Sequence, residues 1–311
     1  MEEVLYCNVS AANVWTNPDK VRDIDLPSLT APVRLKEWLH ALDVELRRDL
    51  VGRLESQLLF GEPVLVLEKQ GDWCKVCAPL QFDPKDERGY PGWVPLRQLA
   101  SHEDFHHRGE QDLFAWVTSD TALLTLEDET QMELSFMTRL PWIGESDGQV
   151  LVLTPNGETG RIPCSDVWTG ARLPVRDAGY RIHTAKRFLG LPYLWAGMSS
   201  FGFDCSGFVH RIFAAGGITI PRDANIQAKY GEAVKRDQLQ PGDLVFFAHE
   251  EGAGAIHHVG MYIKEGRFIH SPNSGNPVRI NALTDDPYGR EFCGGARYTG
   301  KESFLCSSVN S

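Results

Sequence analysis

The sequence lacks a hydrophobic run long enough to cross a membrane, and its first residues lack the basic and apolar segments of a secretion signal. The stretch from Met1 to Tyr6 carries two glutamates instead. These absences predict a cytoplasmic protein with no membrane partner.

Positive charge is also scarce. The chain has 31 lysines and arginines against 42 aspartates and glutamates, which gives a formal net charge of -11 at pH 7. Nucleic acids and other anionic polymers would be repelled at long range by such a surface. The composition therefore excludes nucleic acid as a partner and favours a small soluble ligand over an anionic polymer.

The cysteines do not form a disulfide pattern, because seven is an odd number and they are scattered along the chain. Cys74 and Cys77 have a spacing that can mark a zinc or redox pair, but they lie in a strand-like stretch where residues three apart face opposite sides. The histidines do not show metal-ligand spacing either. We expect a protein that needs no metal and no organic cofactor.

One cysteine, Cys205, directly precedes an apolar segment with helical periodicity. The apolar positions run from Phe208 to Phe213, and Gly216 and Gly217 supply a C-terminal stop. Cys205 should therefore lie in the first turn of a buried helix. The partial positive charge at a helix N-terminus favours a thiolate, so this position suits a nucleophile.

Two strand-like runs downstream form a predicted β-hairpin. They cover residues 256–263 and 267–271, and the three residues Lys264-Glu265-Gly266 separate them. A three-residue loop with Gly266 in the left-handed conformation fits this spacing. We therefore expect Ile263 to pair with Arg267.

This register decides which histidines can act together. It places His258 and His270 diagonally on one face, whereas a strict two-residue turn would put them on opposite faces. One imidazole can then take the proton of Cys205 while the other orients it, as in an activated nucleophile. His257 is the alternative base if the register slips by one residue, because neighbouring side chains of a strand point to opposite faces.

Five motifs between residues 193 and 270 occur in the order and spacing of one known family. They are Tyr193-x-Trp195, Asp204-Cys205-Ser206-Gly207, the run Leu-x-Pro-Gly-Asp-Leu-Val-Phe-Phe at 239–247, His258-Val259-Gly260 and Phe268-Ile269-His270. On these motifs the chain resembles the NlpC-type cell-wall cysteine peptidases. The resemblance implies a papain-like α+β domain that hydrolyses peptide bonds in peptidoglycan stems, typically between γ-D-glutamate and a diamino acid.

The resemblance also implies the role of each catalytic residue. Cys205 would be the nucleophile, His258 the base and His270 the third, orienting residue. Tyr193 would contribute to the oxyanion hole. One departure from the family is Ala196, where a glycine often follows the tryptophan; we expect it to alter the loop and leave the chemistry intact.

Upstream of these motifs the chain consists of short strand-like runs with turn signals, arranged as a weak internal repeat. The first copy covers residues 61–67, 71–76 and 92–95, and the second covers 139–143, 147–152 and 160–163. Such patterns predict two small β-barrels that hide their strand edges, and they resemble bacterial SH3-like domains. Residues 33–50 have helical periodicity and predict an amphipathic helical insertion packed on the sheet.

These features predict an α+β multidomain chain, with two SH3-like β-barrels followed by a papain-like α+β cysteine peptidase domain. The expected divisions are 1–103 for the first barrel with its insertion near 33–50, 104–170 for the second barrel, 171–300 for the NlpC-type domain and 301–311 for a tail.

The order of two SH3-like domains before an NlpC-type domain resembles the dipeptidyl-peptidase VI group, which is implicated in recycling wall peptides inside the cell. In that group the first SH3-like domain holds the free amino end of L-Ala-γ-D-Glu-diamino acid. The matching positions here are Glu55 and Tyr90, and Asp223 would add a second carboxylate. Two carboxylates and a phenol would compensate an ammonium removed from water. Glu62 is the nearby competitor for Glu55. The remaining substrate-binding candidates are Trp195, Asp204 and Ser206.

We therefore predict a cysteine peptidase that hydrolyses the γ-D-Glu-diamino acid bond of free murein peptides with an N-terminal L-Ala, such as L-Ala-γ-D-Glu-L-Lys or its meso-diaminopimelate counterpart. Cys205 would attack the γ-carbonyl to form an acyl-enzyme, and water activated at His258 would hydrolyse it. Two alternatives are a broader wall endopeptidase whose barrels bind polymer, and a catalytically silent protein that binds wall fragments.

Overall fold

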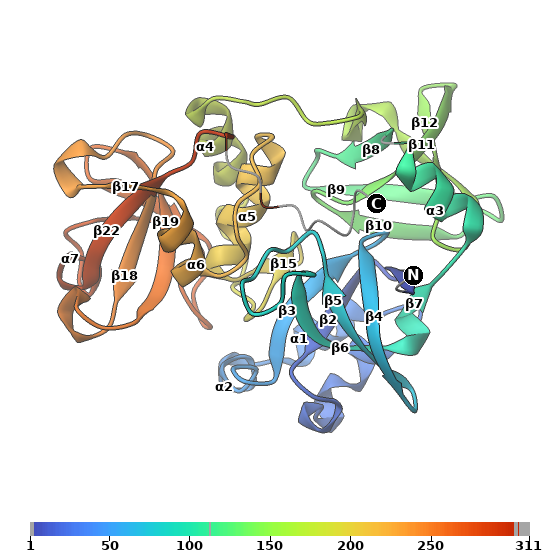
Figure 1. Ribbon diagram of the computed structural model, residues 1–311, viewed down its shortest axis with the longest axis horizontal. Coiled ribbons are helices and arrows are strands. Elements are labelled where there is room, and N and C mark those ends of the chain that lie inside the picture. The colour runs from blue at the N-terminus through green and yellow to red at the C-terminus, as the bar shows by residue number, and fades with distance from the viewer. Residues whose placement is uncertain (1–2, 112, 302–303, 305–311) are drawn as a thin grey trace.

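A computed structural model of the chain describes residues 3–111, 113–301 and 304, so the predicted tail lies almost wholly outside the described residues. Two β-rich units precede one α+β unit along the chain, as predicted. Figure 1 shows the first β-unit in blue, the second in green, and the C-terminal unit from yellow to red beside them. Among the described helices, none has the length and apolarity needed to span a membrane.

The two β-units repeat one strand order. The first sheet runs β3-β2-β6-β5-β4-β1-β7 and the second runs β10-β9-β13-β12-β11-β8-β14, which is the same order with seven added to each strand number. The internal repeat predicted from the sequence is thereby confirmed. The first β-unit contains β1 (Val4–Cys7), β2 (Ala11–Trp15), β3 (Leu54–Leu59), β4 (Pro63–Gln70), β5 (Trp73–Ala78), β6 (Tyr90–Pro95), a 3-10 turn (Leu96–Gln98) and β7 (Leu99–Ala100). The second contains β8 (Phe114–Val117), β9 (Thr121–Leu126), β10 (Gln131–Ser135), β11 (Arg139–Ser146), β12 (Gln149–Leu153), β13 (Thr159–Pro163), a 3-10 turn (Cys164–Asp166) and β14 (Val167–Gly170).

The sheets differ from the expected barrels in how they end. In the described residues, backbone pairing runs from β3 to β7 and from β10 to β14 without joining the two end strands. The edges are protected in another way: β7 is only two residues long, and β3 is covered by strand β15 of the C-terminal unit. Docking to a neighbouring unit thus replaces ring closure at this edge.

The insertion between β2 and β3 is helical, but it is not one helix. It contains 3-10 turns at Pro18–Lys20 and Asp23–Leu29, followed by α1 (Leu35–Ala41) and α2 (Val44–Arg48). The chain breaks because the Asp43 side chain caps α2, accepting a hydrogen bond from the Leu46 backbone at 2.8 Å. Trp38 of α1 is buried and donates its indole N–H to the buried Asp25 at 2.8 Å, which ties α1 to the preceding 3-10 turn, and its ring shares an apolar cluster with Trp15 of β2.

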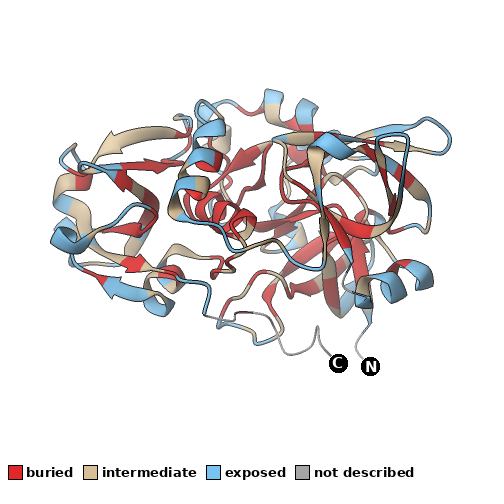
Figure 2. Cartoon of the chain, turned by 90° about the horizontal axis from the view of Figure 1, so that it is seen from above, coloured by how far each residue is buried: buried red, intermediate tan, exposed pale blue. Residues whose placement is uncertain are grey.

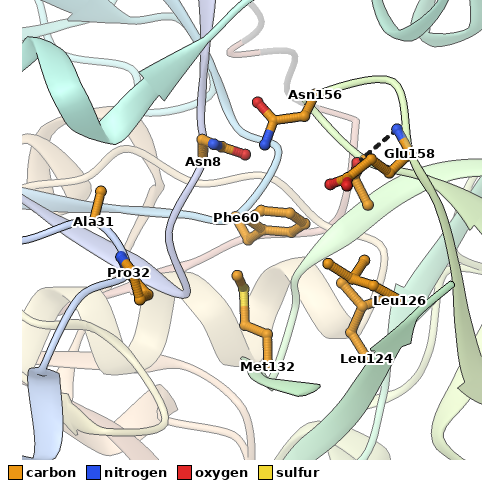
Figure 3. A pocket seen from close by; sticks show the side chains of 10 residues that line it. Asn8, Ala31, Pro32, Phe60, Leu124, Leu126, Met132, Asn156 and Glu158 are labelled. Atoms are coloured by element: carbon orange, nitrogen blue, oxygen red, sulfur yellow. Dashed lines mark hydrogen bonds between the residues drawn. The ribbon is translucent and has the colours of Figure 1, made fainter. Parts of the chain in front are cut away.

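The two β-units are joined by helix α3 (Glu103–Glu110), which carries the buried Phe105 against Tyr6 of β1. A cavity of about 270 Å³ lies between the units. Figure 3 shows Asn8, Pro32 and Phe60 of the first unit facing Leu124, Leu126, Met132, Asn156 and Glu158 of the second. None of the residues singled out from the sequence as a site candidate lines this cavity.

The C-terminal unit packs helices against a six-stranded antiparallel sheet of order β17-β22-β18-β19-β20-β21. Its helices are α4 (Ala178–Arg187), α5 (Cys205–Ala215), α6 (Ala224–Tyr230) and α7 (Tyr288–Glu291), with 3-10 turns at Arg236–Gln238 and Glu250–Gly252. Its strands are β15 (Met198–Ser199), β16 (Gly202–Phe203), β17 (Glu232–Val234), β18 (Leu244–Ala248), β19 (Ile256–Lys264), β20 (Arg267–His270), β21 (Arg279–Ala282) and β22 (Phe292–Arg297).

Helix α5 lies at the centre of a core that several units share. Figure 2 shows it as a coil of buried residues in the middle of the molecule. Phe208 and Ile212 of α5 belong to the same apolar cluster as Trp15 and Trp38 of the first β-unit and Phe136 of the second. The three units therefore bury apolar surface together, which holds them in one arrangement.

Buried polar contacts fix the first β-unit on the C-terminal unit. Arg211 of α5 and Glu62 form an ion pair of 2.6 Å, with side chains only 6% and 4% exposed. The Gln57 side-chain oxygen accepts hydrogen bonds from the Met198 backbone and the Ser199 hydroxyl, both at 3.0 Å. Such bonds are directional, so they determine how the two units are oriented.

Removal of Glu62 should strongly destabilise the protein, because it leaves the Arg211 guanidinium buried without a counter-charge. We expect Glu62→Leu to lower the free energy of unfolding by about 3 to 5 kcal/mol. Glu45→Leu is the matched control: Glu45 pairs with Arg48 on the surface, and its loss should change stability by less than about 0.5 kcal/mol. Urea unfolding at pH 7 measures both, and similar small effects would contradict the role assigned to the buried pair.

Candidate active site

Cys205 is the first residue of α5, as the sequence predicted. The Asp204 side chain caps the helix by accepting a hydrogen bond from the Gly207 backbone at 2.6 Å, and the helix ends at Gly216. The thiol is nearly enclosed, since Cys205 is 9% exposed. Cap and burial together hold the sulfur in a single position at the helix N-terminus.

The charge state of the thiol differs from the sequence-based expectation. Burial raises the pKa of Cys205 to about 12, and the Asp204 carboxylate adds to this effect. Hydrogen bonds from the backbones of Val259 and Ser206 lower the pKa, but they do not outweigh burial. At neutral pH this raised pKa favours the neutral thiol over the thiolate.

The hairpin after β19 has a shorter turn than predicted. Lys264, not Ile263, pairs with Arg267, and the turn is the two residues Glu265 and Gly266, which have φ values of 52° and 70°. A β-bulge at Ile263 shifts the register back by one residue. Beyond the bulge the pairing is the predicted one, so the predicted face is correct although the predicted loop is wrong.

His258 and His270 meet on that face. His258 Nε2 lies 2.7 Å from His270 Nδ1, and His270 Nε2 lies 3.0 Å from the side-chain oxygen of Asn281 on β21. Burial lowers the pKa of His258 well below its usual value and that of His270 to about 4. Both imidazoles are therefore neutral near pH 7. Sequence reasoning missed Asn281, because no motif marks β21 as the partner of β20.

His257 faces a different environment from His258. Its imidazole is 31% exposed, lies 3.3 Å from Glu291 and stacks on His249 at a ring distance of 4.2 Å. Val259, the residue after His258, supplies the backbone contact to the Cys205 sulfur. His258, in contrast, is buried and paired with His270, so it and not His257 belongs to the buried pair of imidazoles.

Tyr193 is buried near Cys205. Burial raises the pKa of its phenol well above 10, and the nearby Cys205 raises it further. Its backbone carbonyl accepts a hydrogen bond from Arg47 at 3.1 Å. The insertion therefore also contacts the C-terminal unit, whereas the sequence predicted only its packing on the sheet of the first β-unit. The phenol keeps its proton at neutral pH and can donate it in a hydrogen bond.

Trp195 links the C-terminal unit to the first β-unit. Its indole N–H donates to the Leu54 carbonyl at 3.0 Å, and the ring packs against the shared core. The next residue, Ala196, has a φ of 62°. Glycine adopts this left-handed conformation without strain, which explains why the family often has glycine there.

Arg222 is a second residue that the sequence analysis missed. It is 1% exposed, donates to Asp204 Oδ2 at 2.6 Å and to Ser206 Oγ at 2.8 Å, and reaches Ser56 Oγ of the first β-unit at 3.0 Å. Asp204 and Ser206 are thus engaged in supporting α5; as substrate ligands they stay a prediction. The signal available in the sequence was an arginine directly before the predicted acid at 223.

Tyr90, Glu55 and Asp223 come together across the unit boundary, as the sequence predicted. The Tyr90 hydroxyl lies 3.0 Å from Asp223 Oδ2 and 3.4 Å from Glu55 Oε2. Burial raises the pKa of both Tyr90 and Asp223. We call these three residues the acidic cluster.

Two further groups border the acidic cluster. Asp83 is buried, and among the described residues its Oδ2 atom has no hydrogen-bond partner. Lys85 Nζ lies 3.9 Å from Asp223 Oδ2 and 5.2 Å from the centre of the Tyr90 ring, but its side chain is 60% exposed. Arg222 also lies 4.0 Å from Asp223 Oδ1, but Asp204 already compensates its charge, so this corner has more carboxyl groups than cations.

A helix that presents a thiol to a sheet carrying paired imidazoles is the architecture of the papain-like cysteine peptidases. Within that class, the chain belongs to the NlpC/P60 family, whose model matches residues 190–297. Residues 46–99 match the bacterial dipeptidyl-peptidase SH3 domain, and residues 117–169 match the YKFC SH3b2 domain.

Similar proteins cover nearly the whole chain. A gamma-D-glutamyl-L-lysine dipeptidyl-peptidase of Bacillus cereus is 44% identical over 301 residues, which is 94% of this chain and 90% of that protein. Its namesake in Bacillus subtilis is 41% identical over 292 residues, covering 91% and 95%. The crystal structure of an NlpC/P60 family protein from Bacillus cereus matches with a TM-score of 0.93 at 43% identity and covers 95% of this chain and 99% of that one.

Acid should destabilise the protein through its buried imidazoles. The native pKa of His270 is about 4, against about 6.5 in an unfolded chain, so the unfolded state gains protons first as the pH falls from 6.5 towards 4. The free energy of unfolding should then fall by about 1.4 kcal/mol per pH unit for each such imidazole. His258 behaves in the same way, as does His210 in α5, whose pKa burial lowers to about 3.

Urea unfolding at pH 7 and pH 5 tests this expectation. His270→Gln removes the imidazole that burial keeps unprotonated. The fall in the free energy of unfolding from pH 7 to pH 5 should therefore be smaller by about 2 kcal/mol in this variant than in the wild type. An unchanged pH dependence in this variant would show that His270 is not held neutral by burial.

Proposed function

We propose that the protein hydrolyses the bond between γ-D-glutamate and the diamino acid of free L-Ala-γ-D-Glu-L-Lys, or of its meso-diaminopimelate counterpart, and releases L-Ala-γ-D-Glu. The observation that carries the proposal is the acidic cluster, whose two carboxyl groups and phenol hydroxyl suit a peptide amine. The activity named for the two Bacillus relatives supports it.

The acidic cluster suits an ammonium group. Glu55 and Asp223 supply charge, and the Tyr90 hydroxyl supplies a further polar contact, so an amine that leaves water finds acceptors. Lys85 is exposed enough to move aside for it. A stem that is acylated at this amine, as in intact wall, has no cation to offer, so the proposed specificity is for free peptides.

Glu62 is not available for this task. Its carboxylate is buried and paired with Arg211 at 2.6 Å. Of the two acids considered from the sequence, Glu55 is therefore the proposed amine ligand.

A chain of contacts joins the acidic cluster to the nucleophile. Asp223 follows Arg222, whose guanidinium binds the side chains of Asp204 and Ser206 on either side of Cys205. A peptide whose amine rests on the acidic cluster would be held by one rigid network that also supports the thiol. Fixed positioning of this kind accounts for a large part of catalysis in peptide hydrolysis.

The proposed reaction begins with transfer of the Cys205 proton to His258. The sulfur attacks the γ-carbonyl carbon, and Tyr193 together with the N-terminal backbone N–H groups of α5 stabilises the negative oxygen. The protonated His258 then gives its proton to the leaving amine of the diamino acid, and a thioester remains. His258 next takes a proton from water, which attacks the thioester and regenerates the thiol.

The proposed setting is the cytoplasm, in the recycling of wall peptides. A net charge of -11 suits a small soluble substrate better than an anionic wall polymer. Incubation with both tripeptides and with intact sacculi, followed by mass analysis of the products, separates this function from that of a wall endopeptidase. Release of fragments from sacculi at rates similar to tripeptide cleavage would refute the proposed specificity.

Loss of the nucleophile or the base should abolish hydrolysis while preserving the fold. We expect Cys205→Ala to be inactive, and His258→Ala to lose about 100-fold or more in kcat, because the base accelerates proton transfer. His257→Ala is the matched control and should retain most activity, since its imidazole pairs with Glu291. Tripeptide turnover measures all three, and an inactive His257→Ala with an active His258→Ala would reverse the assignment.

The amine should matter through Glu55. N-acetylation of the tripeptide should reduce kcat/KM by about 5- to 150-fold, equivalent to about 1 to 3 kcal/mol for a charge-assisted contact. In Glu55→Gln the same acetylation should have a smaller effect, because part of the contact is already lost. Equal kcat/KM for free and acetylated peptides in the wild type would rule out the amine site.

A further inference from the structure

We propose that Asp285 is a positioning residue which, through Asn281, sets the tautomers of His270 and His258 and so keeps Nδ1 of His258 free to accept a proton. This inference rests on the proposed function for its catalytic meaning. Its structural content, the location of two protons, is independent of the substrate. The inference depends on a series of hydrogen bonds from Asp285 through Asn281 and His270 to His258, in which each acceptor determines the donor that faces it.

The series starts at the carboxylate of Asp285, in the turn after β21. Its Oδ2 atom accepts hydrogen bonds from the side-chain amide of Asn281 at 2.8 Å and from the backbone of Ala282 at 2.9 Å. An ionised carboxylate can only accept, so the amide nitrogen of Asn281 must face it. These two hydrogen bonds, and to a lesser degree Arg267 and Arg279, lower the pKa of Asp285, which keeps this group ionised.

The orientation of Asn281 fixes the proton of His270. With its nitrogen turned to Asp285, the amide presents its oxygen to His270 Nε2 at 3.0 Å. That oxygen also only accepts, so Nε2 of His270 must carry a proton. The neutral imidazole has a single N–H, and its Nδ1 atom therefore carries a lone pair.

The same logic passes to His258. Its Nε2 atom lies 2.7 Å from the unprotonated Nδ1 of His270, so it must be the donor in this bond. His258 is neutral because burial lowers its pKa, which leaves its Nδ1 atom without a proton. Nδ1 is then the nitrogen able to accept the Cys205 proton.

A reversed amide at Asn281 would reverse every step. Its NH2 group would face His270, Nε2 of His270 would become an acceptor, and the N–H of each imidazole would move to Nδ1. His258 would then present a proton where the mechanism needs a lone pair. The cost of placing the amide oxygen against the Asp285 carboxylate prevents this reversal.

The test combines imidazole tautomers with kinetics. Nitrogen-15 NMR of labelled protein at pH 7 reports which ring nitrogen bears the proton, and His270→Gln identifies the coupled pair of signals. In the wild type we expect His258 and His270 to be protonated at Nε2. In Asp285→Leu, where Asn281 is free to turn, we expect a mixture with the Nδ1-protonated form. The kcat for tripeptide should fall about tenfold or more while KM stays within about twofold, because the acidic cluster is unaffected.

Two variants complete the design. Asp285→Asn retains a side-chain oxygen that can accept both hydrogen bonds, so it should restore the wild-type tautomers and most of kcat. Asp286→Leu removes the neighbouring carboxylate, which pairs with Arg290 on the surface. This variant should change neither the imidazole tautomers nor kcat. A thermal melt of each variant identifies any that fails to fold.

Wild-type His270 protonated at Nδ1, or Asp285→Leu with unchanged tautomers and unchanged kcat, would overturn the inference. A change of tautomers in Asp285→Leu supports the inference about Asp285, even if the protein does not cleave the tripeptide. Absence of tripeptide cleavage would count against the proposed function alone.

Discussion

The buried guanidinium of Arg222 is the group on which the arrangement of the site depends. A charge that is 1% exposed must be compensated, and Asp204 supplies the counter-charge while Ser206 and Ser56 supply further acceptors. Through Asp204 this charge holds the cap of α5, the helix that begins with Cys205. Through Ser56 it draws strand β3 of the first β-unit against the C-terminal unit, beside Asp223. One desolvated cation thus links the cap of the thiol helix to the acidic cluster.

Burial gives the candidate catalytic groups an unusual charge state. The same enclosure raises the pKa of the Cys205 thiol and lowers those of His258 and His270, so neither a thiolate nor an imidazolium is favoured before substrate arrives. The proposed reaction therefore depends on transfer of the Cys205 proton to His258. In such a site, which ring nitrogen of each imidazole carries the proton decides which nitrogen can accept one. Asn281 and its partners are important because they determine this position.

The two β-units share a strand order but meet the C-terminal unit through different surfaces. The first brings Glu55 and Tyr90 to the site, whereas the second docks through Ser135, which accepts a hydrogen bond from the Ser200 backbone at 2.9 Å, and through the contact of Phe136 with Phe188. One copy of this fold therefore contributes residues to the candidate site, and the other packs against the C-terminal unit away from these residues. Docking of this kind also protects the sheet edge at β3, which helps to explain why the sheet need not close into a ring.

The sequence by itself determined the local elements and the chemistry they carry. Helical periodicity after Cys205, the strand pattern around His258 and the repeat in the β-units all arise from short-range preferences, and the structure bears out each of them. The break in the insertion at Asp43 and the two-residue turn at Glu265 were missed, because a competing cap and a compensating bulge leave little trace in hydrophobic periodicity.

Only the tertiary structure decided which distant groups meet. Three pairings join separate segments: Arg222 with Ser56, Glu62 with Arg211, and His270 with Asn281. They depend on burial, which raises the energetic cost of any unpaired charge or hydrogen-bonding group. Because burial is a property of the packed molecule and not of any one segment, neither the charge state of the thiol nor the direction of the imidazole hydrogen bonds could be derived from the order of residues alone.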